Sequence, residues 1–269
     1  IMKIKFVSLF ALLAVLAISC KDKPKETETE TEVEAIEETA ETPITIEKLE
    51  GSPAYAEASL KITKPTAETV KATAGGIDFA FDVQNYELGA QTDSDLTGTL
   101  ANSDKGQHIH FIVDNDPYSA HYEPTFKKEL EDGTHYLVAF LSRSYHESVK
   151  NPNAFIAKKV VVGAESADAP DVDLSEPTLI YSRPKGEYTG DVTENLLLDF
   201  YLLNTTLSEG GNYVKATING EEFELTEWVP YVVKGLPKGE ASVKLELLDK
   251  DGQVLPGAFN TVERTVTLK

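Results

Sequence analysis

The sequence of 269 residues contains one cysteine, one methionine and one tryptophan. A single cysteine cannot form an intrachain disulfide, so the folded part must be stabilised by its apolar cores. Basic residues are scarce as well: 25 Lys and Arg stand against 45 Asp and Glu, which gives a formal net charge of -20. This balance argues against nucleic acid or an anionic membrane surface as a partner.

The chain also lacks long apolar runs, apart from residues 6–18. That run is too short to span a bilayer comfortably, but it has the length of a secretory signal core, and lysines precede it. It leads to Cys20, and the segment Leu16–Cys20 (LAISC) resembles a bacterial lipobox, with Ala17 where leucine is commonest. We therefore expect residues 1–19 to be a lipoprotein signal peptide and Cys20 to carry a lipid. The expected location is the outer membrane, on the cell surface or the periplasmic face.

After Cys20 comes KDKPK and then an alternating Glu/Thr tract to about Glu41. So few apolar residues and so much like charge predict an extended, disordered tether, which we place at residues 20–52. The lysine and acidic residues at its start resemble the surface-export signal of lipoproteins from Bacteroidota-type bacteria. The lipid is then the only membrane contact that we expect.

From about Pro53 onward, short alternating apolar runs are separated by Gly, Pro, Asn and Asp; examples are GIDFAFDV, HIHFIV and TVERTVTL. This pattern, without a long 3.6-residue period, predicts an all-β protein. The two halves also align with each other: the HIHFIV strand after Gly106 matches the YVKATI strand after Gly211, and Gly133 matches Gly239.

A repeat of about one hundred residues predicts tandem domains rather than a solenoid. Units with about seven strands resemble immunoglobulin-like or fibronectin-III-like sandwiches. We therefore expect two tandem immunoglobulin-like β-sandwich domains, at residues 53–163 and 177–269, joined by a linker at residues 164–176.

The repeat serves as an internal control for histidine. All of the histidines lie in the first domain: His108, His110, His121, His135 and His146. The second domain has Tyr213 and Lys215 where the first has the HxH pair, so the fold does not require histidine there. The first domain also carries 14 extra residues between Leu88 and Gly106, counted as 18 steps against 4 from Leu207 to Gly211. Function often accumulates in such an added loop.

Side chains alternate along a strand, so His108 and His110 share one face, while Ile109 and Phe111 face the core of the sandwich. A two-residue turn at Asp114-Asn115 or at Asn115-Asp116 would bring His121 opposite one of the two histidines. Either register places His108, His110, His121 and Glu123 on one face; a three-residue loop would not.

A loop with the sequence SRSYHES should reach the same end of this face, and it contains His146 and Glu147. Several imidazoles and a carboxylate suit Cu(II) or Zn(II), so we expect a metal site at His108, His110, His121, Glu123 and His146. Binding to neutral imidazoles should weaken as the pH falls through about 6.5.

Two other interpretations of these residues remain open. The histidines can be polar residues on a solvated face, or part of a ligand-contacting aromatic patch with Tyr118, Tyr122, Tyr136, Phe140 and Glu147. His135 occupies the slot of a corner tyrosine, and we assign it to structure. The HxH pair also resembles that of cupins, but the glycine spacing and the second motif of cupins are missing.

The segments GQHIHFIVDNDPY and SRSYHES resemble a set of exported bacterial proteins without an established activity. The sequence has no glycine-rich phosphate loop, zinc-protease helix motif or nucleophile elbow. We therefore expect a non-enzymatic, lipid-anchored binding protein of the cell envelope that binds copper or zinc through the first domain. The alternatives are a structural or adhesive module for a protein or glycan and, third, a metal-dependent enzyme.

Overall fold

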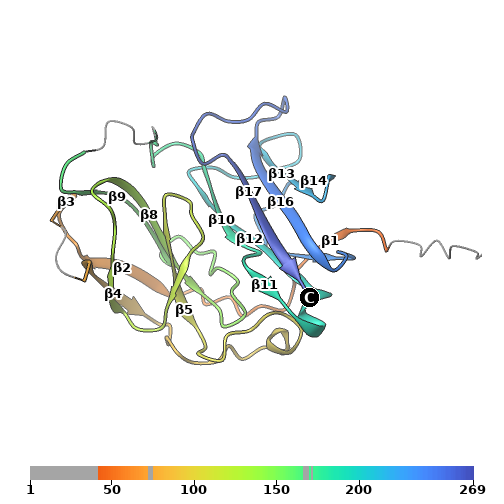
Figure 1. Ribbon diagram of the computed structural model, residues 1–269, viewed down its shortest axis with the longest axis horizontal. Coiled ribbons are helices and arrows are strands. Elements are labelled where there is room, and N and C mark those ends of the chain that lie inside the picture. The colour runs from red at the N-terminus through yellow and green to blue at the C-terminus, as the bar shows by residue number, and fades with distance from the viewer. Residues whose placement is uncertain (1–41, 72–74, 166–169, 171) are drawn as a thin grey trace, which may run out of the picture. The chain divides into compact units, whose positions relative to one another are not determined.

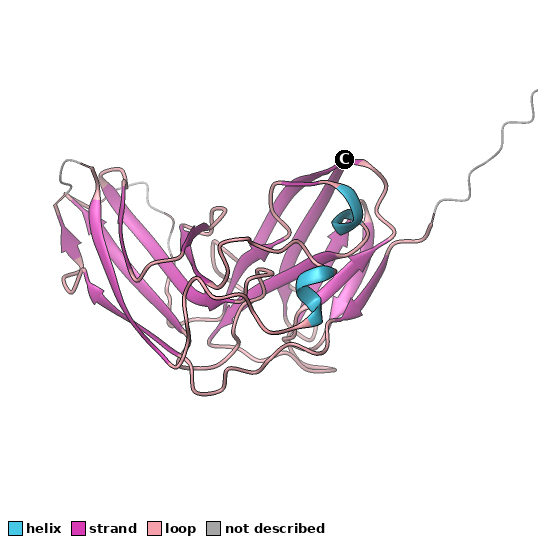
Figure 2. Cartoon of the chain, turned by 90° about the horizontal axis from the view of Figure 1, so that it is seen from below, coloured by secondary structure: helices cyan, strands magenta, loops and turns pink. Residues whose placement is uncertain are grey.

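The computed structural model describes residues 42–71, 75–165, 170 and 172–269. Its elements are β-strands and two short 3-10 helices, η1 (Asp95–Gly98) and η2 (Gly190–Thr193) (Figures 1 and 2). Within these ranges, no helix has the length and apolar character needed to cross a membrane. The predicted signal peptide, Cys20 and most of the predicted tether lie outside the described residues.

The first sandwich consists of a three-stranded sheet, β2-β4-β7, and a five-stranded sheet, β3-β9-β8-β5-β6. Its core lies between the two sheets and includes Phe79, Ile109, Phe111 and Leu137. In chain order the strands are β2 (Ser59–Lys64), β3 (Thr69–Val70), β4 (Ile77–Gln84), β5 (His108–Val113), β6 (Ser119–His121), β7 (Thr125–Lys128), β8 (Gly133–Ser142) and β9 (Phe155–Val162).

The second sandwich repeats this strand order with sheets β1-β15-β12-β10 and β11-β17-β16-β13-β14. Its core includes Leu198, Phe200, Val214 and Leu245. The strands are β1 (Thr45–Lys48), β10 (Thr178–Arg183), β11 (Glu187–Tyr188), β12 (Leu196–Leu203), β13 (Tyr213–Ile218), β14 (Glu221–Leu225), β15 (Tyr231–Lys234), β16 (Gly239–Leu248) and β17 (Thr261–Leu268). The predicted fold class, all-β with tandem immunoglobulin-like sandwiches, is confirmed.

One strand of the second sandwich comes from the segment before the first. β1 pairs with β15 in antiparallel fashion, with Ile46 opposite Val233. Ile44 and Ile46 are both apolar and share one face of the strand, so they pack against the second core. The prediction of a disordered tether as far as residue 52 is therefore wrong for this stretch.

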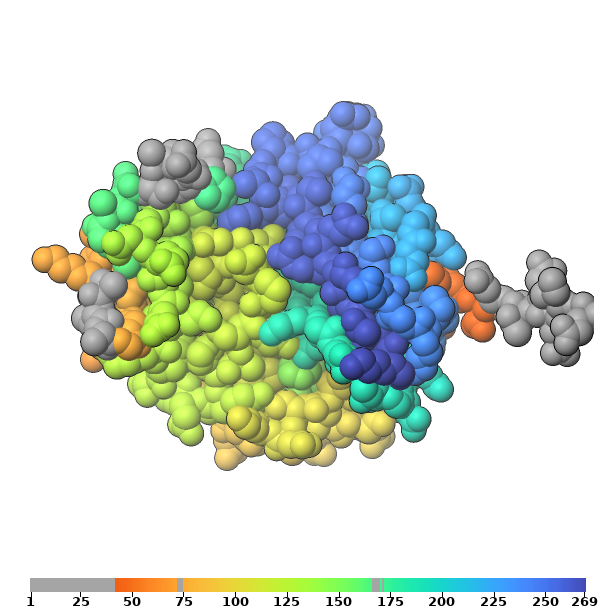
Figure 3. Space-filling model, viewed as in Figure 1, coloured from red at the N-terminus to blue at the C-terminus, as the bar shows by residue number. Residues whose placement is uncertain are grey.

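The two sandwiches also share a third apolar core. The face of β5 and β8 that points away from the first core packs on the corresponding faces of β10 and β12. Tyr201 on β12 stacks on Phe140 on β8, with ring centroids 4.9 Å apart. In the space-filling view, the teal and blue surface of the second sandwich adjoins the yellow-green surface of the first (Figure 3). This shared core comprises Ile112, Tyr118, Tyr136, Val138, Phe140, Ile180, Tyr201, Leu203 and Phe259.

Candidate metal centre

His108 and His110 lie on β5, between β8 and β6 in the five-stranded sheet of the first sandwich. The alternation predicted from the sequence is correct, because Ile109 and Phe111 belong to the first core. Both histidines nevertheless have 0% of their surface exposed. The second sandwich covers this face, so the interpretation as a solvated strand face is wrong for these two residues.

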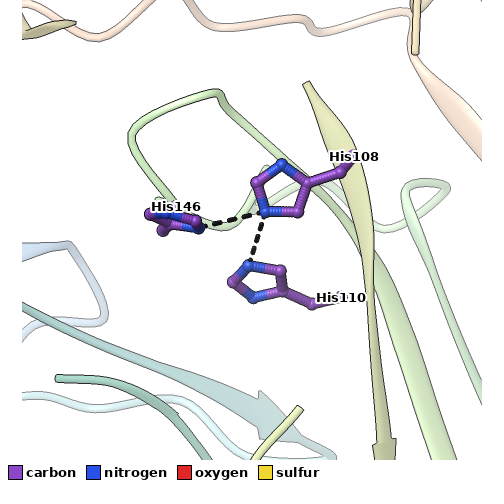
Figure 4. A group of neighbouring side chains, drawn as sticks. All are labelled: His108, His110 and His146. Carbon is purple, nitrogen blue, oxygen red and sulfur yellow. Dashed lines mark hydrogen bonds between the residues drawn. The ribbon is translucent and has the colours of Figure 1, made fainter. Parts of the chain in front are cut away.

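His146 reaches the pair from the turn that follows β8. The His146 amide donates to the Arg143 carbonyl (2.9 Å), and the Arg143 amide donates to the Glu147 carbonyl (2.9 Å). His146 has a φ of 71°, in the left-handed region that residues other than glycine seldom adopt. This turn directs the imidazole back over β5, as Figure 4 shows.

The added loop of the first sandwich supports this turn. The Ser144 amide donates to Thr92 Oγ1 (2.9 Å), and the Thr92 amide donates to Ser144 Oγ (3.1 Å). Ser103, farther along the same loop, donates its amide to the Ser144 carbonyl (2.9 Å). The loop that the second domain lacks thus holds Ser144, which lies two residues before His146, in place.

Three ring nitrogens converge at the end of β5. His108 Nε2 lies 3.0 Å from His110 Nε2 and 3.1 Å from His146 Nδ1, and one ligand atom from each residue lies within 4.8 Å of the others. Nitrogens on one tetrahedral ion, with bonds of about 2.0–2.1 Å, are about 3.3 Å apart. The two short contacts are close to that spacing, so the cluster can hold a metal ion.

Hydrogen bonds on the far side of two rings orient them. His108 Nδ1–H donates to the Gly106 carbonyl (2.8 Å), which leaves its Nε2 lone pair directed into the cluster. His110 Nδ1 lies 3.2 Å from Ser182 Oγ on β10 of the second sandwich. Metal-binding histidines commonly use the second nitrogen in this manner.

Protons alone cannot satisfy the contacts within the cluster. A neutral imidazole has one N–H, and His108 uses its own at Nδ1, so His108 Nε2 offers one lone pair. Both His110 Nε2 and His146 Nδ1 approach that nitrogen, at 3.0 and 3.1 Å. One of the two N···N contacts therefore lacks a well-directed hydrogen bond, whereas a metal ion would use all three lone pairs.

Burial keeps these imidazoles neutral. It lowers the pKa of His108 to about 4, with a smaller contribution from the charge of Arg183. Burial also lowers the pKa of His110 and of His146 well below the usual value, and Arg183 and Lys185 add to both shifts. Neutral imidazole is the form that binds a metal, so acid should weaken binding at a lower pH than the 6.5 expected from the sequence.

The structure does not bring His121 and Glu123 to the cluster. β6 pairs with β5 so that His121 lies opposite Ile109, one residue away from either predicted register. The predicted register is therefore wrong, because the turn contains one more residue, with Asp114 and Asn115 both at positive φ. His121 instead stacks on Phe126, with ring centroids 3.4 Å apart, and Glu123 is exposed.

Tyr118 and Tyr122, predicted as ligand contacts, both lie beside the histidines. The Tyr118 ring stacks on His110 at 3.5 Å, and its hydroxyl lies 3.2 Å from His146 Nδ1. The Tyr122 ring centroid is 5.0 Å from that of His108.

Glu147 and His135 have contacts of a different kind. Glu147, the third predicted ligand contact, forms a buried ion pair with Arg143 (2.9 Å) and accepts a hydrogen bond from Ser52, so it supports the turn. His135 contacts Asp114 Oδ2 (2.7 Å) and the Glu131 carbonyl (2.9 Å), in keeping with the structural role expected for it.

Sequence reasoning missed the residues that the second sandwich contributes. Besides Ser182, the Lys185 ammonium lies 4.2 Å and the Arg183 guanidinium 5.3 Å from the centre of the Tyr118 ring. One signal was available: the run Leu196–Leu203 (LLLDFYLL) is apolar on both faces of its strand, which indicates a strand covered on both sides.

No family model and no curated protein matches the sequence. Solved structures with some likeness include the fibronectin(III)-like modules of Clostridium thermocellum CbhA (16% identity, 78% of this chain and 94% of that chain, TM-score 0.27). Another is SGBP-B of the Bacteroides ovatus mixed-linkage glucan utilization locus, in complex with a mixed-linkage heptasaccharide (11%, 78% and 70%, TM-score 0.23). A third is the FN1–FN3 segment of chicken CNTN1 (7%, 77% and 63%, TM-score 0.21). Likeness at this level implies no ligand and no activity for this chain.

Proposed function

We propose that this protein is a non-enzymatic binding protein of the cell envelope that holds one Cu(II) or Zn(II) ion through His108 Nε2, His110 Nε2 and His146 Nδ1. Imidazole nitrogen suits both ions. The observation that carries the proposal is the convergence of three neutral imidazoles, in which one of the two short N···N contacts is not a well-directed hydrogen bond.

The anchor of the proposed protein is a lipid on Cys20. A signal-like apolar run, a lipobox-like segment and an acidic stretch with lysines at its start support this part of the proposal. The lipid would hold the folded part at the outer membrane, on the cell surface or the periplasmic face, where metal ions from outside the cell can reach it.

Titration calorimetry with Cu(II) and Zn(II) at pH 7 tests the proposal. The protein should be the full chain with Cys20→Ala, because this change removes the only thiol that could compete for metal. We expect one equivalent of ion to bind. His146→Ala should weaken binding at least about tenfold, since it removes a ligand and loss even of supporting groups costs 10–100-fold.

His121→Ala is the matched control, because His121 belongs to the same sheet but not to the cluster. It should bind like the parent protein. If the parent binds no ion stoichiometrically, or if His146→Ala binds as tightly as His121→Ala, the metal function is wrong. The histidines would then serve only the packing between the sandwiches, in a structural or adhesive protein.

A further inference from the structure

The three histidines supply three donors, whereas a tetrahedral ion takes four ligands. We propose that Tyr118 Oη is the fourth ligand of the ion; this inference rests on the proposed metal function of the histidine cluster. Tyr118 lies between β5 and β6 and has 5% of its surface exposed.

The position of the hydroxyl supports this assignment. Tyr118 Oη is 3.2 Å from His146 Nδ1, close to the 3.0 and 3.1 Å that separate His108 Nε2 from the other two ring nitrogens. The Tyr118 ring lies almost parallel to the His110 ring, with centroids 3.5 Å apart and an interplanar angle of 13°. The oxygen thus lies at the edge of the same small cluster as the three nitrogens.

Metal binding would also change the hydrogen bonding of this hydroxyl. Tyr118 Oη lies 3.2 Å from His146 Nδ1, and the Arg183 side chain also forms a hydrogen bond with it. When His146 Nδ1 gives its lone pair to a metal, it can no longer accept a hydrogen bond from the hydroxyl. The Arg183 guanidinium can only donate, so its hydrogen bond persists to a deprotonated, metal-bound oxygen.

Burial raises the pKa of the Tyr118 hydroxyl, and the charge of Arg183 acts in the opposite direction. The surrounding charges thus favour an anionic oxygen once an ion is bound. Within the described part of the chain, the cluster contains histidines and no carboxylate. Lys185 Nζ donates to the Tyr118 carbonyl (2.6 Å) and lies 4.2 Å from the ring centre; the Arg183 guanidinium lies 5.3 Å from it. Arg183 Nε is buried and has no hydrogen-bond partner among the described residues.

Coordination would form a metal–oxygen bond and release the phenolic proton to solvent. The phenolate would neutralise one positive charge of the ion, and the two cations would stabilise it. Both cations come from the second sandwich, which thereby contributes to the metal site without supplying a ligand.

Tyr122 offers a matched control in the same segment. Its ring lies 5.0 Å from that of His108, but its hydroxyl has a partner outside the cluster, Ser103 Oγ at 2.8 Å. Removal of the Tyr122 hydroxyl should therefore leave coordination unchanged.

The test is visible absorption and resonance Raman spectroscopy of the full chain with Cys20→Ala, loaded with one equivalent of Cu(II). A tyrosinate bound to Cu(II) gives a ligand-to-metal charge-transfer band and enhanced phenolate vibrations. We expect both signals in the parent protein and in Tyr122→Phe, and neither in Tyr118→Phe. Tyr118→Phe should also weaken Cu(II) binding by about tenfold.

A parent protein that binds Cu(II) stoichiometrically without these signals overturns the role of Tyr118 and leaves the three-histidine site standing. The same holds if the signals persist in Tyr118→Phe. A parent that binds no Cu(II) overturns the metal function and this inference together. If Tyr118→Phe does not fold, the signals in the parent protein and in Tyr122→Phe decide: their persistence in Tyr122→Phe supports Tyr118, and their loss there overturns its role.

Discussion

β5 and β13 occupy the same place in two copies of one fold, but their outward faces differ. On β13, Tyr213, Lys215 and Thr217 are partly exposed, and Lys215 forms ion pairs with Glu222 (3.4 Å) and Glu246 (3.2 Å). On β5, His108 and His110 are buried and contact other rings and the second sandwich.

The difference lies in what covers each face. The strand geometry is shared, yet the other sandwich packs on the outward face of β5, whereas in the second copy it packs on β10 and β12 and leaves β13 open. A polar residue on a covered face must find a partner inside the protein, because an unpaired buried polar group is costly. The histidines on β5 therefore contact one another and neighbouring rings, whereas the corresponding face of β13 carries a partly solvated ion-pair network.

The largest effect should come from opening the covered face. Tyr201 on β12 is fully buried and lies between rings of the first sandwich, Phe140 and Phe155, each 4.9 Å away. Tyr201→Ala should lower the free energy of unfolding by about 3–5 kcal/mol, as expected for a large buried ring. Denaturant unfolding of the full chain measures this loss.

Tyr213→Ala, on the outward face of β13, is the comparison for that measurement. Tyr213 is only partly buried, so its removal should change stability little. Equal losses for the two variants would contradict the distinction between a covered and an open face.

The second largest effect should be a loss of stability in acid, caused by the buried histidines of the covered face. Burial lowers the pKa of His108 from 6.5 in a free imidazole to about 4. Between these values the unfolded chain binds more protons than the folded protein, so the free energy of unfolding falls as the pH drops from about 6.5 to about 4. The stabilisation is fully present above pH 6.5. Between pH 6.5 and about 4, each such histidine lowers the free energy of unfolding by at most about 1.4 kcal/mol per pH unit.

An NMR titration of the metal-free protein checks the cause of this loss. The His108 ring signals should stay constant from pH 7.5 to near pH 5, because the imidazole remains neutral. A midpoint for His108 close to 6.5 would show that solvent reaches this face, contrary to the structure.

The smallest effect should come from the strand that precedes the first sandwich. Ile46 on β1 is partly buried against the core of the second sandwich. Ile46→Ala should cost about 1 kcal/mol, less than a fully buried isoleucine would. Thermal unfolding beside the exposed Thr45→Ala variant tests this, and equal midpoints would indicate that β1 contributes nothing to the second sandwich.

Local sequence patterns predicted most of the fold and part of the site. Alternation identified Ile109 and Phe111 as core residues, and the position of the SRSYHES loop placed His146 near His108. Tyr118 was predicted only as a member of the aromatic patch beside the histidines, because the predicted register of the returning strand placed it on the opposite face.

The remaining errors have two physical sources. His121 fell on the wrong face because one additional residue in a turn reverses the side of every residue in the paired strand. Ser182 and Lys185 were missed because contacts between domains depend on which surfaces meet, and alternation within one strand does not encode this.

X-ray absorption at the metal edge tests the central claim, a metal site formed by three imidazoles, most directly. The sample is the full chain with Cys20→Ala after loading with one equivalent of Zn(II) and removal of the excess. We predict nitrogen or oxygen neighbours at about 2.0–2.1 Å and the outer-shell scattering of three imidazoles, reduced to two in His146→Ala. A spectrum of oxygen ligands without imidazole scattering, or one unchanged by His146→Ala, would contradict the claim.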